Sequence, residues 1–132
     1  MKTILAIDDE SLVRNAYQYA LEGKDYRLLL AENGEQGLAI ARENRPDLVF
    51  LDLKMPGIDG VETLRRLMAS DPQLNVYIVT GFQQEYMDSL KAAMDEGLKF
   101  EVAAKPLNAE QIGMIASIAL ENATFVQEDR AQ

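Results

Sequence analysis

The chain has 132 residues, of which 48% are hydrophobic, and its formal net charge at pH 7 is −9. This length suits one compact domain, and so acidic a surface argues against nucleic-acid binding, which depends on lysines and arginines that neutralise phosphates. Cysteine and histidine are absent, which excludes disulfides, thiolate and imidazole catalysis and Cys/His zinc sites.

Membrane insertion and secretion are not indicated either. No apolar stretch reaches the roughly 20 residues that a membrane-spanning helix needs. The amino-terminal sequence MKTILAIDDE has a short apolar run that acids interrupt, which does not match a secretory signal peptide. We therefore expect a cytoplasmic protein without membrane contact.

In the first part of the chain, apolar runs alternate with segments in which apolar residues recur at helical spacing. Several of the runs are continuously apolar, as is typical of strands covered on both faces of a parallel sheet. Gly23 suits the end of the first helix, and Asn33-Gly34 is a turn signal before the second. The predicted elements are strand Thr3–Ile7, helix Ser11–Glu22, strand Tyr26–Ala31, helix Glu35–Asn44 and strand Leu48–Leu51.

The same alternation continues to the end of the chain. Asp71-Pro72 stops the third helix, Gly97 closes the fourth, and Asn108 is a good N-cap for the last. The predicted elements are helix Val61–Ser70, strand Val76–Val79, helix Gln83–Glu96, strand Phe100–Ala104 and helix Ala109–Thr124.

This order is (βα)5, and it predicts an α/β fold with a single doubly wound five-stranded parallel sheet and helices on both faces. We expect one domain over residues 1–126 and a polar tail over residues 127–132. The last predicted helix is unusually apolar, because Ile112 and Ala116 lie on one side and Met114, Ile118 and Phe125 nearly opposite. Either the buried arc is wide, or the second side is a partner or dimer surface.

Residues able to do ion or phosphoryl chemistry end four of the five apolar runs. Asp8 and Asp9 end the first, Asp52 the third, Thr80 the fourth and Lys105 the fifth. Because the carboxyl ends of parallel strands share one edge of the sheet, where ligands bind, we expect these side chains to converge on one site.

Carboxylates that meet at one edge repel one another unless something offsets their charge. A hard divalent cation such as Mg²⁺ does so, since it prefers oxygen ligands and is usually held by one or two carboxylates and phosphate oxygens. An aspartate carboxylate such as Asp52 can take a phosphoryl group and form an acyl phosphate. The Lys105 ammonium and the Thr80 hydroxyl would then neutralise charge on the phosphoryl oxygens.

Four segments, ILAIDDE, LVFLDLKMPGIDG, VYIVTG and VAAKP, occur in this order across nearly the whole chain. Together they resemble the receiver domain of the two-component response-regulator family, whose fold is flavodoxin-like. The resemblance implies a phosphorylation-activated signalling domain, with no enzymatic activity beyond its own phosphorylation and dephosphorylation. It implies that a sensor histidine kinase or a phosphotransfer protein supplies the phosphoryl group.

The resemblance also implies a role for each site residue. Asp52 would be the phosphoacceptor. Asp9, Asp52 and the backbone carbonyl of Lys54 would hold Mg²⁺ or Mn²⁺, and Asp8 would act mainly through water. Thr80 would bind a phosphoryl oxygen and move toward it on activation.

In this family Lys105 would pair with the phosphoryl group, and the Lys105–Pro106 peptide bond is typically cis. Many receivers carry an aromatic switch residue three positions before this lysine, where the present chain has Val102. Phe100 lies on the same face by strand parity and is a candidate substitute. Phe82, two residues after the threonine, is expected to shield the phosphorylated aspartate and to lengthen its lifetime.

Three alternatives remain beside this interpretation. Phosphatases of the haloacid-dehalogenase type need a second aspartate two residues after the nucleophile, where this chain has Lys54. A flavodoxin-like cofactor carrier needs a Ser-, Thr- and Gly-rich phosphate loop where Asp-Asp-Glu stands. A pseudo-receiver that accepts no phosphate would not need the complete set of Asp52, Thr80 and Lys105.

The sequence does not identify the downstream target of the domain. We expect a downstream protein or an output domain outside this sequence as the partner, and the sequence fits both a stand-alone receiver and a piece of a longer regulator. The fourth helix, fifth strand and fifth helix form the surface that phosphorylation would switch, and this surface is a candidate homodimer interface.

Overall fold

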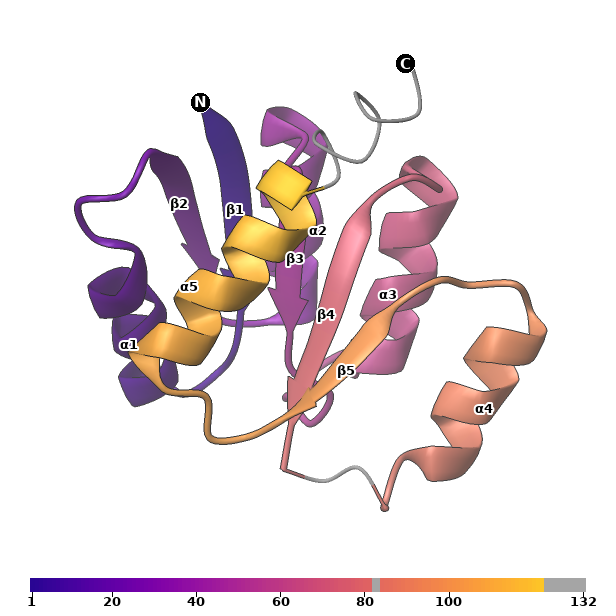
Figure 1. The fold of residues 1–132 in the computed structure, drawn as a ribbon. Coiled ribbons are helices and arrows are strands. Elements are labelled where there is room, and N and C mark those ends of the chain that lie inside the picture. Colours follow the sequence, from indigo (N-terminus) through magenta and orange to yellow (C-terminus); the bar gives the residue numbers. More distant parts are fainter. Residues whose placement is uncertain (82–83, 123–132) are drawn as a thin grey trace.

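The computed structural model describes residues 1–81 and 84–122. All strands lie parallel in one sheet with the order β2-β1-β3-β4-β5, which confirms the predicted sheet (Figure 1). β3 occupies the centre, and the order changes direction at β1, where β2 lies on one side and β3 on the other. The strands are β1 Lys2–Ile7, β2 Tyr26–Ala31, β3 Leu48–Leu51, β4 Asn75–Thr80 and β5 Glu101–Ala104.

Helices connect the strands in the predicted order. Within the described ranges, none of them combines the length and the apolar character needed to cross a membrane. The last helix continues as a π-helical segment, η1. The helices are α1 Ser11–Leu21, α2 Gly34–Asn44, α3 Gly60–Ser70, α4 Met87–Asp95, α5 Ala109–Ser117 and η1 Ile118–Asn122.

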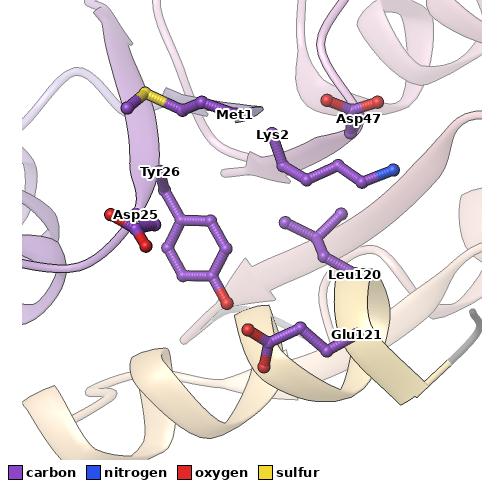
Figure 2. Close-up of a pocket in the computed structure, with 7 residues that line it drawn as sticks. All are labelled: Met1, Lys2, Asp25, Tyr26, Asp47, Leu120 and Glu121. Atoms are coloured by element: carbon purple, nitrogen blue, oxygen red, sulfur yellow. The ribbon is translucent and has the colours of Figure 1, made fainter. Parts of the chain in front are cut away.

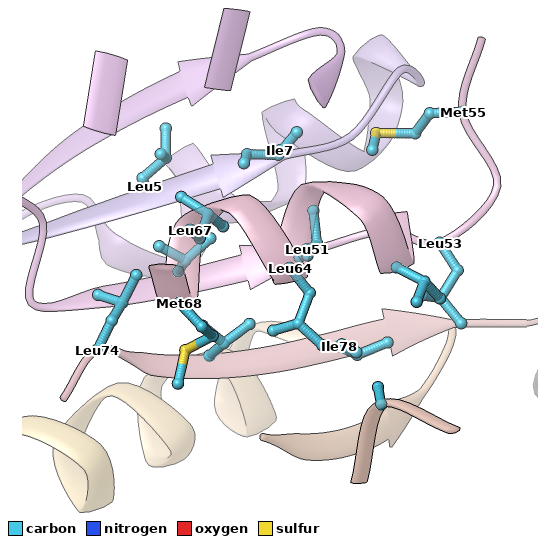
Figure 3. Packing of buried hydrophobic residues seen from close by; sticks show 14 of the residues in the cluster. Leu5, Ile7, Leu51, Leu53, Met55, Leu64, Leu67, Met68, Leu74 and Ile78 are labelled. Carbon is cyan, nitrogen blue, oxygen red and sulfur yellow. The ribbon is translucent and has the colours of Figure 1, made fainter. Parts of the chain in front are cut away.

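Alternate residues of the strands pack against helices on opposite faces of the sheet, as the strand period of two requires. Leu5 and Ile7 of β1 belong to the core that α2, α3 and α4 cover, part of which Figure 3 shows. Ile4 and Ala6 belong to the core under α1 and α5. The two-sided burial explains why β3 reads as the uninterrupted apolar run LVFL, with every residue buried.

Short polar side chains begin three of the helices. The Asn33 side chain accepts a hydrogen bond from the Gln36 amide at the start of α2. The Asp59 side chain accepts one from the Glu62 amide at the start of α3. At the start of α5, Asn108 and Gln111 form a reciprocal capping box. These caps satisfy amides that have no partner within the helix, and they fix where each helix leaves the carboxyl edge of the sheet.

The structure differs from the sequence prediction mainly at element ends. Helix α4 begins at Met87, because residues 84–86 form a turn, and the predicted first residue, Gln83, lies outside the described residues. β5 begins at Glu101, one residue after the predicted Phe100. Thr124, Phe125 and the expected tail at 127–132 lie outside the described residues.

Candidate functional site

Asp52 directly follows β3, the central strand. Its amide donates to the Ile7 carbonyl at 3.0 Å, and its side chain is only 4% exposed. Gly60, the first residue of α3, lies against this backbone, because its amide donates to the Leu53 carbonyl at 2.8 Å. A Cβ atom at Gly60 would collide with the Asp52 carbonyl oxygen and Leu53 Cα, so only glycine lets α3 start so close to Asp52.

Asp8 directly follows β1, the strand beside β3, and its side chain is 2% exposed. Its Oδ1 accepts a hydrogen bond from the Glu10 amide at 2.9 Å. The backbone is fixed as well, since the Asp8 amide donates to the Ala31 carbonyl at 3.0 Å and Arg14 Nη1 donates to the Asp8 carbonyl at 2.8 Å.

The Lys105 ammonium joins these two aspartates. Its Nζ lies 2.8 Å from Asp8 Oδ2, 3.4 Å from Asp52 Oδ2 and 3.5 Å from Glu10 Oε1. The Lys105 amide donates to the Thr80 carbonyl at 3.1 Å, and the Lys105–Pro106 peptide bond is cis, as the family resemblance implied. The predicted convergence of the strand ends is thus observed for β1, β3 and β5.

At this site, burial and the neighbouring negative charge favour the neutral form of Asp52, whereas Lys105 favours its charged form. Burial and then the Asp8 charge raise the pKa of Asp52 to about 6, although Lys105 acts in the opposite direction. Burial works against the charged form of Lys105, but its hydrogen bond with Asp8 and the charges of Asp52 and Asp8 outweigh burial and raise its pKa. In these contacts the one positive charge of Lys105 faces the two negative charges of Asp8 and Asp52.

The other predicted site residues lie around this cluster. Thr80 ends β4, is fully buried and is paired in register with Ala104. Asp9 is exposed, but its carboxylate lies within 4.8 Å of those of Asp8 and Glu10. Lys54 lies in the loop after Asp52, and its ammonium is 3.9 Å from Glu85 Oε2.

The donor set suits a hard cation. Asp52 Oδ1 is buried and has no hydrogen-bond partner among the residues that the structure describes. This oxygen and the neighbouring carboxylates are the ligand type that Mg²⁺ prefers, and nitrogen or sulfur ligands that favour zinc cannot come from a chain without histidine and cysteine. The residues present therefore fit a magnesium or manganese ion.

The two switch candidates have different environments. Phe100 is half-buried and packs against the core under α2, α3 and α4, whereas Val102 is 38% exposed on β5. Phe82, the candidate shield for the phosphorylated aspartate, lies outside the described residues. Pro106 follows the cis bond at the start of the connection to α5.

Two residues near the cluster were not predicted from sequence. Glu10 shares Lys105 with Asp8, and Arg14 reaches back from α1 to the Asp8 carbonyl and lies 3.7 Å from Glu32. The DDE triplet offered a signal for Glu10, since a third acid stands beside the expected site. Arg14 gave no signal, because an arginine at this position of a helix is ordinarily exposed to solvent.

Comparisons with known proteins agree with this geometry. A model of the family described as "Response regulator receiver domain" matches residues 4–116. The sporulation initiation phosphotransferase F of Bacillus subtilis is 34% identical over 109 residues, which cover 83% of this chain and 86% of that protein. The transcriptional regulatory protein AfsQ1 of Streptomyces coelicolor is 41% identical over 80 residues, and the match spans 61% of this chain but only 35% of AfsQ1.

Solved structures share the fold over nearly the whole length. A response regulator receiver domain protein from Clostridium thermocellum is 31% identical with a TM-score of 0.80, and the match covers 96% of this chain and 99% of that one. A CheY-like receiver domain protein from Methanospirillum hungatei has a TM-score of 0.79 at 21% identity, covers 100% and 99% of the two chains, and supports the fold alone. The extent of the family match, together with the aspartates and lysine gathered at one sheet edge, shows that this chain belongs to the response regulator receiver domain family.

Proposed function

We propose that this receiver domain accepts a phosphoryl group on Asp52 from a sensor histidine kinase or a phosphotransfer protein. The observation that carries the proposal is the contact of one ammonium group, Lys105 Nζ, with the buried carboxylates of both Asp8 and Asp52. A relative of which this chain covers 86% is itself named a phosphotransferase, which favours phosphoryl exchange with another protein.

The transfer would proceed by attack of an Asp52 carboxylate oxygen on the phosphorus of a phosphohistidine. A P–O bond forms, the P–N bond breaks, and the electron pair stays with the imidazole nitrogen. The ring leaves directly as neutral imidazole when its other nitrogen carries a proton, and otherwise becomes neutral when the departing nitrogen takes up a proton. A pKa of about 6 leaves Asp52 mostly ionised at pH 7, as a nucleophile must be. The Lys105 ammonium would then neutralise charge on the phosphoryl oxygens, and the Thr80 hydroxyl would donate a hydrogen bond to one of them.

The proposal includes a divalent cation. Asp9, Asp52 and the Lys54 backbone carbonyl would hold Mg²⁺ or Mn²⁺, and Asp8 would act mainly through a water molecule. The cation would offset the negative charge that accumulates when a phosphoryl group approaches these carboxylates. The buried Asp52 Oδ1, which has no protein partner in the described ranges, supports this assignment.

Phosphorylation would switch a surface built from α4, β5 and α5. New contacts of the phosphoryl group with Thr80 and Lys105 would bias the position of β4 and β5, whose ends are joined by the Lys105 amide and the Thr80 carbonyl. This surface carries exposed apolar side chains that suit a downstream protein, an output domain or a second copy of the chain. They are Met87 and Met94 of α4, Val102 of β5, Met114 of α5, and Ile118 at the start of η1, which continues α5.

The test is incubation with acetyl phosphate, with and without Mg²⁺, followed by intact mass measurement. We expect the wild type to gain one phosphoryl group only when Mg²⁺ is present. Asp52→Asn should gain none, and the exposed Asp25→Asn variant should behave as the wild type does. Phosphoryl incorporation that persists in Asp52→Asn would refute the assignment of the acceptor.

A second arm tests the donor class. A purified histidine kinase with its phosphoryl label should lose the label to wild-type protein and keep it with Asp52→Asn. Hydrolysis of many equivalents of a phosphate monoester such as p-nitrophenyl phosphate would instead support a phosphatase of the haloacid-dehalogenase type.

A further inference from the structure

A groove between α2 and α3 opens at the amino edge of the sheet, the edge opposite Asp52. It has a volume of about 510 Å³. Leu38 of α2, Leu67 of α3 and Leu74 before β4 give it an apolar floor. Since Pro46 lines the groove and lies six positions before Asp52 along a largely extended segment, the groove lies about 20 Å from the proposed phosphorylation site.

Positive charge is concentrated on this groove in a chain whose net charge is −9. Arg42, Arg45 and Arg66 line it, against Asp71 as the one acidic lining residue. Arg66 Nε donates to Glu62 at 2.9 Å, and Asp71 accepts from the Gln73 amide. For Arg42 and Arg45, no ion pair is found among residues 1–81 and 84–122.

A second pocket at the same edge lacks this character. Its volume is about 680 Å³, and Lys2 lines it together with three acids, Asp25, Asp47 and Glu121 (Figure 2). Acids outnumber the lysine, so that pocket has no preference for an anion. The arginine-lined groove is therefore not a general property of this edge of the sheet.

Helix geometry explains only part of the arginine cluster. Arg42 stands in the last turn of α2, where a cation is favoured by the helix dipole. Arg45 caps the same helix with a left-handed backbone, φ 47°, a conformation that favours glycine. Its amide donates to the Ala41 carbonyl, and glycine would do this equally well, so the cap does not account for the arginine side chain.

We propose that the groove binds a short acidic and apolar peptide segment of a partner protein. An apolar side chain of the segment would pack on Leu38, Leu67 and Leu74, and its carboxylates would pair with Arg42 and Arg45. The groove extends about 10 Å along α2 from Leu38 to Arg45, which accommodates about three extended residues. A nucleic acid is disfavoured by the overall charge, and a bare anion would leave the leucine floor uncovered.

The test is a titration of the full-length, ¹⁵N-labelled chain with the synthetic peptide acetyl-Glu-Leu-Asp-Leu-Glu-amide, followed by amide chemical shifts. We expect saturable shifts in the carboxyl-terminal halves of α2 and α3, with a Kd on the order of 1 mM. The uncharged peptide acetyl-Gln-Leu-Asn-Leu-Gln-amide should bind at least about tenfold more weakly, because it cannot pair with the arginines. Acetate at the same carboxylate concentration should produce no saturable shifts.

Variants separate binding from folding and from phosphorylation. Arg45→Gly should weaken binding several-fold and leave Tm no lower than that of the wild type, since glycine suits the left-handed cap. Arg42→Gln should also weaken binding, whereas Arg27→Gln, an exposed arginine on β2, should not. All three variants should take up a phosphoryl group as the wild type does.

Equal binding of the acidic and uncharged peptides would overturn the proposal, as would undiminished binding by Arg45→Gly and Arg42→Gln. Shifts that acetate reproduces would also overturn it, since they would show attraction of a bare anion. Failure of phosphoryl uptake in every protein, with peptide binding intact, would refute the proposed function and leave the groove assignment standing.

Discussion

Three physical effects act on the ionisation of the Asp52 side chain. Burial and the Asp8 charge oppose ionisation, and the ammonium of Lys105 at 3.4 Å supports it. The net result is a carboxylate that stays ionised at neutral pH but destabilises the folded protein. The same charge that would make Asp52 a nucleophile in the proposed reaction therefore works against folding.

Asp52→Asn should raise the free energy of unfolding in the absence of divalent cations. The folded pKa of about 6 lies above the ordinary value of 3.8, so the cost of ionisation is absent at low pH, grows through this interval and is complete above it. At pH 7.5 we expect a gain on the order of 2 to 3 kcal/mol, which disappears at about pH 4. Urea unfolding in EDTA across this pH range measures it.

The exposed Asp25→Asn variant serves as the control for this prediction, because its carboxylate is not part of the cluster. A gain for Asp52→Asn that does not depend on pH would contradict the explanation from charge and burial.

Lys105→Met should destabilise the protein, because it leaves Asp8 and Asp52 buried and close together without their cation. We expect a loss of about 2 kcal/mol at pH 7.5, reduced from the value for a fully buried pair because the lysine is 16% exposed. In an Asp52→Asn background the loss should be smaller. A double-mutant cycle from urea unfolding gives the coupling, and additive effects would show that Lys105 and Asp52 do not interact.

At the scale of the elements, we expect the substitution of glycine by alanine to have opposite effects on stability in α3 and in α5. Gly60→Ala places a Cβ against the Asp52 carbonyl and Leu53 Cα and should cost about 1 to 3 kcal/mol. Gly113→Ala, within α5, meets only the end of the Lys24 side chain at 3.5 Å and should stabilise by about 0.5 to 1 kcal/mol. Thermal unfolding of both variants tests this contrast, and a loss of stability in both would contradict it.

Element ends show what the sequence predicted and what it did not. The start of α5 was predictable, because Asn108 is a strong N-cap, and the structure confirms it. The start of α4 was not, because Gln84 and Glu85 have ordinary helix propensities and the actual N-cap, Tyr86, makes no side-chain capping bond. No local residue therefore marks this boundary.

The site was largely predictable because parallel strands bring their carboxyl ends together whatever their separation in sequence. What sequence patterns did not determine is which oxygen contacts which nitrogen. Lys105 contacts Asp8 and Glu10, whereas the neighbouring Asp9 is exposed. Consecutive side chains after a strand point in different directions, so the choice between Asp8 and Asp9 depends on the turn into α1.

Over the whole molecule, the uneven burial of the strands should set a gradient of amide hydrogen exchange. β3 is buried at every residue and the Asp52 amide is bonded to β1, whereas three of the four residues of β5 are exposed. We expect β3 and Asp52 amides to exchange only through global unfolding and β5 amides through smaller openings. Exchange at pH 7 followed by NMR measures both, and equal protection of the two strands would contradict the expectation.

The central position of β3 therefore has a consequence for how a signal would pass through this domain. Covalent chemistry at Asp52 would occur on a part of the backbone that we expect to open slowly, so the acceptor geometry would persist through ordinary fluctuations. The conformational response would occur at the outer strand β5, where we expect a lower free energy of local opening than at β3. Phosphorylation and the conformational response to it would thus take place on parts of one sheet that differ in local stability.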